Sequence, residues 1–244
     1  MSKIKKFIFS VVMLIFCVML ILVIFFPGLY WYQKYADDAK HINIPVQNFM
    51  LPEEPLPEDW ISYDMYGISF MAPPDLHLNE KNHEKIGKYM TLSTLSVDES
   101  AEALSYGKYP VTKDELRQFC QDTGNSYPES NYDSWNLILN LSMHDCNLHS
   151  WRSAKAFAHL ADLKALQIKL SCFGIFYHHA DNYQMFILID GYYASLASGA
   201  RVLIFPDNQP YMLGDMRMIG RTSDFVRIIS SIKVTELQES DIAD

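Results

Sequence analysis

The chain has 244 residues, with 20 Lys or Arg against 29 Asp or Glu, and a formal net charge of −9 at pH 7. Nucleic-acid binding requires a basic face that attracts phosphate, and the sequence has no cluster of Lys and Arg outside its N-terminus. We therefore expect no nucleic-acid partner. Much of the acidity lies in residues 36–59 and 236–244, so the part between them is expected to be only mildly acidic.

Residues 7–26, FIFSVVMLIFCVMLILVIFF, form a long apolar stretch. At ~1.5 Å per residue, a helix of this length covers roughly 30 Å, which is the thickness of the hydrocarbon core of a bilayer. A cleaved signal peptide has a shorter apolar stretch, of about 7 to 15 residues, that ends at small residues. This stretch leads instead into the bulky FFPGLYWY. We predict an uncleaved transmembrane helix that contacts the lipid bilayer through residues 7–26.

The flanks of this helix predict its orientation. Three lysines precede it and two follow at a similar distance, a modest bias toward a cytoplasmic N-terminus. Residues 1–6 are therefore expected to be a cytoplasmic tail, and the C-terminal part extracytoplasmic, in the periplasm of a bacterial inner membrane. Aromatic rings with a polar edge favour the membrane interface. The candidates are Tyr30, Trp31, Tyr32 and Tyr35.

Residues 27–59 are predicted to combine this aromatic belt with a tether. The prolines of the segment are Pro27, Pro45, Pro52, Pro55 and Pro57. The later ones, interleaved with acidic residues, favour an extended and self-repelling chain that holds the following domain away from the membrane. The acidic tail, residues 236–244, is expected to be solvated and disordered.

Residues 60–235 have the size of one domain with a real core. WISYDMYGISFMAPP predicts two short strands around a turn that ends at Gly67, and KYMTLSTLSV has the composition of a strand. TKDELRQFCQDTG predicts a helix, with Thr112 and Glu115 as a capping box and Gly124 as its stop. SWNLILNLSM has apolar residues at every second position and predicts a half-buried strand.

The second half of this domain begins with a predicted helix at Ser150. The alternation that follows fits either a longer helix or a strand that takes over near Leu163, and we prefer the strand. YQMFILID, YYASLAS and ARVLIFP predict strands separated by glycines, and YMLGDMRMIG is a further candidate.

SDFVRIISSIKV predicts a closing helix. Ser223 is its expected N-cap. The residues expected to face inward are Phe225, Ile228, Ile229 and Ile232. Together these elements predict an α+β fold with a mostly antiparallel sheet and about three packed helices.

Two fragments, YGISFMAPP at 66–74 and FVRIISSIK at 225–233, resemble the opening hairpin and closing helix of the PsbP/Mog1/DcrB-like α+β fold. A tryptophan that this family often has shortly after the proline is replaced here by PDLHL. The resemblance implies a role in binding or assembly rather than catalysis. It carries over no site residue.

Two segments are rich in side chains that bind metals, HDCNLH and HHAD. Their candidate ligands are His144, Cys146, His149, His178, His179 and Asp181. Zinc and copper take imidazole, thiolate and carboxylate ligands, but the spacing matches no standard site. We therefore expect no metal and no other cofactor, and keep a metal site as the alternative.

Three cysteines, Cys120, Cys146 and Cys172, follow the apolar helix. Outside the cytoplasm one disulfide among them is expected. Cys172 follows the apolar face of a predicted strand as a buried thiol, so Cys120 with Cys146 is the first choice. A nucleophile formed by Cys146 with His178 or His179 is the catalytic alternative, because a nearby imidazole would lower the thiol pKa.

The sequence has no phosphate-binding loop, dinucleotide fingerprint or serine nucleophile elbow. We therefore expect a membrane-anchored, non-enzymatic envelope protein that binds a protein partner, either as an accessory subunit or as an immunity-type binder. The alternative is a thiol- or metal-dependent hydrolase that uses Cys146 and nearby histidines.

Overall fold

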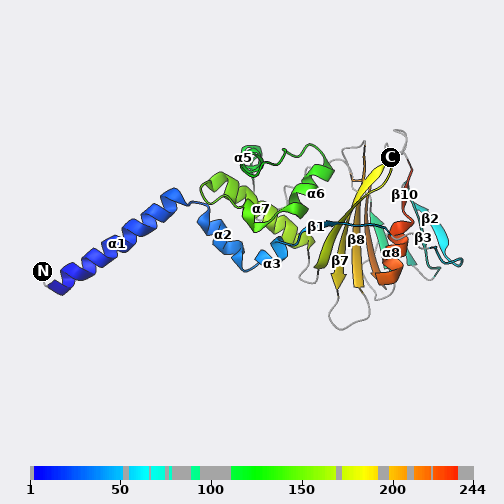
Figure 1. Cartoon of the computed structure of the whole chain (residues 1–244), viewed down its shortest axis with the longest axis horizontal. Helices are drawn as coiled ribbons and strands as arrows, with labels where there is room; N and C mark the ends of the chain where they lie inside the picture. Colours follow the sequence, from blue (N-terminus) through cyan, green and yellow to red (C-terminus); the bar gives the residue numbers. More distant parts are fainter. Residues whose placement is uncertain are drawn as a thin grey trace.

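A computed structural model of the chain describes residues 3–51, 55–65, 67–74, 77–78, 89–93, 111–168, 172–191, 198–207, 212–220 and 222–235. These residues form a mixed α/β structure with two sheets and a projecting N-terminal helix (Figure 1). The helices are α1 Lys3–Phe25, α2 Leu29–Ala36, α3 Ala39–Ile42, α5 Lys113–Thr123, α6 Asn131–Asn140, the short 3-10 helix η1 Met143–Asp145, α7 Trp151–Gln167 and α8 Thr222–Ser230. The strands are β1 Val46–Asn48, β2 Ile61–Met65, β3 Ile68–Ala72, β4 His77–Leu78, β5 Tyr89–Ser93, β6 Cys172–His179, β7 Tyr183–Gly191, β8 Ser198–Pro206, β9 Gly214–Gly220 and β10 Lys233–Val234.

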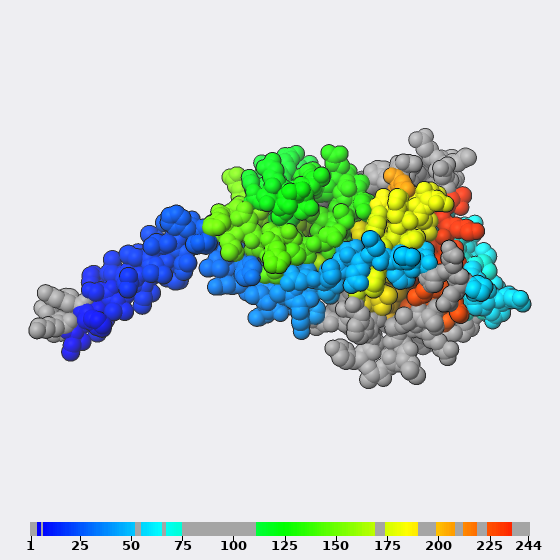
Figure 2. Space-filling model, viewed as in Figure 1, coloured from blue at the N-terminus to red at the C-terminus, as the bar shows by residue number. Residues whose placement is uncertain are grey.

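Helix α1 stands clear of the rest of the molecule, as a stalk (Figure 2). Its segment Phe7–Phe25 is apolar except for Ser10, and 0% of it is buried against the protein. A helix that is hydrophobic on every side needs an apolar environment all round, which water does not provide. Among the residues that the structure describes, this is the one helix long and apolar enough to cross a membrane.

The segment that was expected to be a tether is instead folded onto the body. Helices α2 and α3 bury Trp31, Tyr35 and Ile42, which are 5%, 5% and 1% exposed. Strand β1 then pairs in parallel with β6, and Figure 2 shows this part of the chain lying along the body. The tether prediction is therefore wrong for the described part of 27–59. Trp31 and Tyr35 are four residues apart, so they share one helix face, and that face packs against protein.

The large sheet has the strand order β1-β6-β7-β8-β9-β5-β4. The pairings from β6 through β9 to β5 are antiparallel, as expected, whereas the two outermost pairings are parallel. Strand β7 is buried on both faces: Met185 and Ile187 point into one core, while Phe186 and Leu188 point into another. This double burial explains why its sequence is apolar without alternation.

One face of the large sheet is covered by the small sheet β10-β3-β2 and by helix α8. The β2–β3 hairpin turns at Gly67, whose φ is 74°, as the sequence predicted. The predicted inward residues of the closing helix are all at most 4% exposed: Phe225, Ile228 and Ile229 in α8, and Ile232 after it. The helix ends at Ser230, earlier than predicted, and the chain continues into β10. The side chain of Ser223, its expected N-cap, lies outside the described part.

Helices α2, α3, α5, α6 and α7 lie between α1 and the large sheet (Figure 1). Their apolar faces form what we call the helical cluster, built around Trp31, Tyr35, Leu116, Phe119, Phe157 and Leu160. Helix α5 has the predicted capping box, in which the Glu115 amide donates to Thr112 Oγ1 at 3.2 Å. It ends at Gly124, whose φ of 74° is left-handed.

Helix α6 replaces the strand predicted from SWNLILNLSM. A capping box of Ser130 and Asp133 starts it. Trp135 and Leu139 pack against the sheet, whereas Leu137 and Ile138 belong to the helical cluster. A helix between two cores is apolar on two sides, so its sequence resembles the alternation of a strand. Residues 60–235 therefore have at least four α-helices rather than three.

Helix α7 runs to Gln167, so the change to strand comes later than the predicted position near Leu163. Strands β7, β8 and β9 fall on the predicted segments. Most of YYASLAS, and all of KYMTLSTLSV except Tyr89–Ser93, lie outside the described residues.

Candidate functional site

The structure does not bring the predicted metal ligands together. His149 Nδ1 donates to the Phe25 carbonyl at 2.9 Å, beside α1, and His178 Nδ1 donates to the Phe49 carbonyl at 3.0 Å, at the sheet. His179 Nε2 lies 3.0 Å from Asp207 Oδ2. His144 and Asp181 are exposed. Within the described ranges no group of three or more His, Cys, Asp or Glu side chains could hold a metal ion, so the alternative metal site is not assembled.

Cys146 is not placed as a nucleophile either. Its side chain lies in the helical cluster and is 7% exposed, and this burial raises its pKa to about 12. A nucleophilic cysteine needs a lowered pKa and access to solvent. The two candidate partners, His178 and His179, hydrogen-bond at the large sheet instead, to the Phe49 carbonyl and to Asp207. The burial of this thiol therefore gives the catalytic alternative no support, and that alternative stays a prediction.

Cys120 and Cys146 are both free thiols, and both are buried in the helical cluster. The predicted disulfide between them is not formed in the structure. Burial also raises the pKa of Cys120. Two thiols in an apolar core act as small hydrophobic side chains, which is a sufficient reason for their presence. The side chain of Cys172 lies outside the described part.

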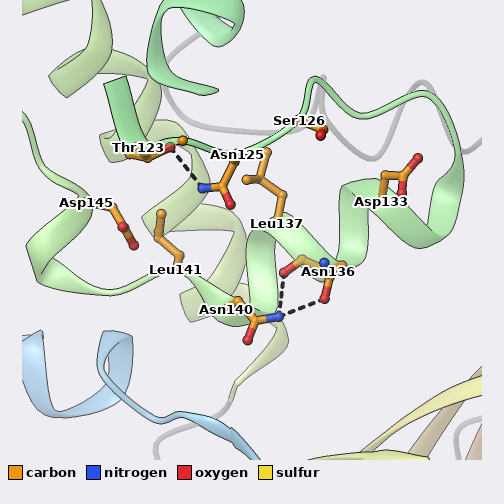
Figure 3. A pocket seen from close by; sticks show the side chains of 10 residues that line it. Thr123, Asn125, Ser126, Asp133, Asn136, Leu137, Asn140, Leu141 and Asp145 are labelled. Carbon is orange, nitrogen blue, oxygen red and sulfur yellow. Dashed lines mark hydrogen bonds between the residues drawn. The ribbon is translucent and has the colours of Figure 1, made fainter. Parts of the chain in front are cut away.

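A polar pocket of about 520 Å³ opens in the helical part of the molecule (Figure 3). It lies between the end of α5, the loop after it, α6 and the segment of η1. Its lining residues are Thr123, Gly124, Asn125, Ser126, Asp133, Asn136, Leu137, Asn140, Leu141 and Asp145.

The polar side chains of this pocket form local hydrogen bonds. Asn140 Nδ2 donates to the Asn136 side-chain and backbone oxygens at 2.7 and 3.0 Å. The carboxylate of Asp133 accepts from the Ser130 hydroxyl at 2.8 Å, and that of Asp145 accepts from the Ser142 amide at 2.7 Å. Both carboxylates thus serve as helix caps. No described lining residue is a His, Cys or Lys, and the lining offers amide, hydroxyl and carboxylate groups for hydrogen bonds.

The pocket could not be predicted from the sequence, because Asn136 and Asn140 were expected on a strand, where residues four apart are about 13 Å from each other. On a helix, residues four apart are neighbours on one face. Two Asn residues four apart, on the exposed side of a helix, were the sequence signal that could have indicated this pocket.

A second feature missed by sequence reasoning joins α1 to the body. The Gly28 amide donates to the Leu148 carbonyl at 2.9 Å, and the rings of Phe26 and His149 are 4.9 Å apart. A Cβ on Gly28 would lie 2.3 Å from the Asn147 carbonyl oxygen, closer than any real contact. We call these contacts, together with the His149–Phe25 hydrogen bond, the stalk junction. They fix the base of α1 against the loop before α7.

A buried charge cluster lies on the sheet face toward α6 and α7. Arg201 donates through two nitrogens to Asp215, at 2.8 and 2.7 Å, and also to Gln167 at the end of α7. Its guanidinium lies 5.3 Å from the centre of the Trp135 ring. Asp215 is 4% exposed. A buried charge that is paired and hydrogen-bonded in this way orients the elements packed around it. The polar groups of Arg201, Asp215 and Gln167 are used in these contacts.

Comparison with protein-family models, with curated proteins and with solved structures gave no match to this chain. The resemblance to the PsbP/Mog1/DcrB-like fold therefore stays a prediction.

Proposed function

We propose that the chain is a single-pass membrane protein that holds its α/β body at the extracytoplasmic surface, where the body binds a protein partner. The first part rests on α1: its segment Phe7–Phe25 is long enough to span a membrane, and 0% of it is buried inside the protein. A cleaved signal peptide would not need packed contacts with the mature body. A retained anchor uses such contacts to hold the body at the membrane. The stalk junction therefore supports retention of α1.

The orientation follows from the sequence around α1. Three lysines lie before the span, and the larger part of the chain follows it. Positive charge near a span favours the cytoplasmic side, and large domains cross regardless of their own charge. We therefore propose that, in a bacterial cell, the body lies in the periplasm.

Binding rather than catalysis is supported by the state of the candidate groups. The thiol of Cys146 is buried with a raised pKa, and His149 lies at the base of α1 whereas His178 and His179 lie on β6. The polar pocket instead offers amides, hydroxyls and carboxylates on a fixed surface. Such groups suit the polar part of a protein interface. The partner is then a component of an envelope assembly, with this chain as accessory subunit, or an incoming protein that this chain neutralises.

The PsbP/Mog1/DcrB-like fold is part of this proposal. The two fragments that carry the resemblance form adjacent parts of the molecule, since β10 pairs with β3 and Ser231 Oγ accepts from the Met71 amide at 2.8 Å. This contact between the two fragments supports the proposed fold.

The test is co-purification of the full-length chain from its native membranes after cross-linking. We expect a stoichiometric protein partner that is lost when the exposed Asn140 is changed by Asn140→Lys, because this puts a charge into the pocket. Leu166→Lys is the matched control, since Leu166 is 65% exposed on another helix. Recovery of no partner, or of one that neither substitution affects, would contradict binding at this pocket.

A further inference from the structure

Two exposed aromatic side chains from distant parts of the chain lie side by side at the base of α1. Tyr30 of α2 is 59% exposed and Trp151 of α7 is 47% exposed. Their rings stack with centroids 6.4 Å apart and an interplanar angle of 28°. Trp151 also lies 5.4 Å from the ring of Trp31, which belongs to the core. Contact with this core residue thus fixes the position of the Tyr30–Trp151 pair.

Trp151 differs from the other tryptophans of the chain. Trp31, Trp60 and Trp135 are at most 8% exposed, so each lies inside the protein. A partner that covered the exposed ring of Trp151 would remove apolar surface from water, which is favourable. Its place at the first residue of α7, directly after the loop of the stalk junction, indicates what that partner is.

The position of the pair along the membrane normal follows from α1. The 19 residues of Phe7–Phe25 extend about 29 Å as a helix, which fills the hydrocarbon core. Phe25 then lies at the edge of the core, and its carbonyl accepts from His149, two residues before Trp151. The polar zone adds roughly 5 to 8 Å on each side. Tyr and Trp concentrate in that zone because their rings are apolar and their edges polar.

From this geometry we infer that Tyr30 and Trp151 rest in the lipid headgroup layer, so that the body sits directly on the bilayer. In Figure 1, α1 leaves the body at the end where α2 and α7 begin, which places these residues toward the membrane. The interface thus includes Trp151, which lies 120 residues after Trp31 in the sequence. The inference rests on the proposed anchor.

The experiment places nitroxide labels on the full-length chain in vesicles of phosphatidylethanolamine and phosphatidylglycerol. One sample carries Trp151→Cys and another Leu166→Cys, both with Cys17→Ala and Cys172→Ala. A third sample keeps Cys17, in the middle of α1, as the depth reference. Accessibility to oxygen, which enters lipid, is compared with accessibility to a water-soluble nickel chelate. Leu166 is the matched control because it is also exposed, near the far end of the same helix.

We expect an oxygen-to-nickel ratio for the label at 151 that is severalfold higher than at 166 and lower than at 17. Equal ratios at 151 and 166, with a deep label at 17, would overturn the inference while leaving the anchor intact. A label at 151 that neither reagent reaches would also overturn it, because protein would then cover the site. A shallow label at 17 would remove the anchor and the inference together.

A second measurement uses no label, so its result does not depend on whether Trp151→Cys disturbs the stalk junction. Lipids brominated near the headgroup should quench the native chain more than the Trp151→Phe variant, since the remaining tryptophans are buried. Equal fractional quenching of the two proteins would count against contact of Trp151 with lipid.

Discussion

The ammonium of Lys164 donates a 2.7 Å hydrogen bond to the backbone carbonyl of Ile42, 122 residues earlier in the chain. The same nitrogen lies 3.1 Å from the Ile44 carbonyl and 2.7 and 2.8 Å from those of Leu139 and Leu141. Ile42 ends α3 and Leu139 is in the last turn of α6, where carbonyl oxygens lack helical donors and attract a cation. Lys164, which belongs to α7, thus joins the end of α3 to the end of α6.

We predict that Lys164→Met destabilises the folded chain by about 3 kcal/mol. Methionine keeps much of the length of the side chain but donates no hydrogen bond, and each buried carbonyl left without a donor costs ~1–3 kcal/mol. The measurement is thermal unfolding of the full chain in detergent, followed by circular dichroism.

Lys40→Met is the control, because Lys40 is an exposed lysine in the same part of the chain. An exposed substitution is expected to stay within about 0.5 kcal/mol. Equal effects of the two changes would show that the hydrogen bonds of Lys164 contribute little.

Gly28→Ala is expected to disrupt the stalk junction for a steric reason alone. The backbone of Gly28, with φ −77° and ψ −12°, suits any residue, but the added Cβ would meet the Asn147 carbonyl oxygen at 2.3 Å. Overpacking of this kind costs roughly 1 to 3 kcal/mol.

Gly124→Ala provides the opposite case. It has open space around its Cβ position but a φ of 74°, so its expected cost of about 1 kcal/mol comes from the backbone. Both variants are compared by thermal unfolding and by tryptophan emission, because Trp31 and Trp151 lie at the junction. An emission change for Gly124→Ala but none for Gly28→Ala would contradict the described junction.

Cys146 is predicted to resist alkylation in the folded chain. With its pKa raised to about 12, roughly one thiol in 10⁴ is ionised at pH 8, and the ionised form is the one that reacts. Iodoacetamide labelling read by mass spectrometry should modify Leu166→Cys rapidly and Cys146 only after unfolding. Rapid labelling of native Cys146 would support the catalytic alternative.

The same raised pKa predicts that stability falls at alkaline pH. The thiol of Cys146 has an ordinary pKa of 9.0, so from there up to about pH 12 it ionises in the unfolded chain but not in the folded one. The unfolded chain then binds fewer protons, and the free energy of unfolding decreases as pH rises. Tyr183, whose pKa burial raises from 10.0 to about 12, adds a similar loss above pH 10.

The measurement is the unfolding midpoint of the native chain and of Cys146→Ala between pH 7 and 11. Each group can contribute a slope of at most about 1.4 kcal/mol per pH unit. We expect a smaller loss in Cys146→Ala above pH 9. Parallel curves for the two proteins would mean that this thiol keeps its ordinary pKa.

Local signals allowed part of this structure to be predicted. Helix α5 follows from Thr112, Glu115 and Gly124, each of which acts within a few residues of itself. The β2–β3 hairpin and the inward face of α8 are also encoded by neighbouring residues. These elements could be predicted without knowing the rest of the fold.

Features that depend on distant partners could not be predicted in this way. The apolar residues of α6 alternate because Trp135 and Leu137 face different cores, which only the packing reveals. Proline and acidic residues suggested a tether, whereas Trp31 and Tyr35 pack onto α7 and its neighbours. Trp151 gave no signal by itself, because its contact with Tyr30 joins segments more than 100 residues apart.

The position of the body relative to the membrane is tested most directly by reporter fusions after Asp244. Alkaline phosphatase is active only outside the bacterial cytoplasm, and a fluorescent protein that matures only inside is the complement. We expect an active phosphatase in the membrane fraction and no fluorescence. A fluorescent fusion with inactive phosphatase would contradict it, because the body would then lie in the cytoplasm.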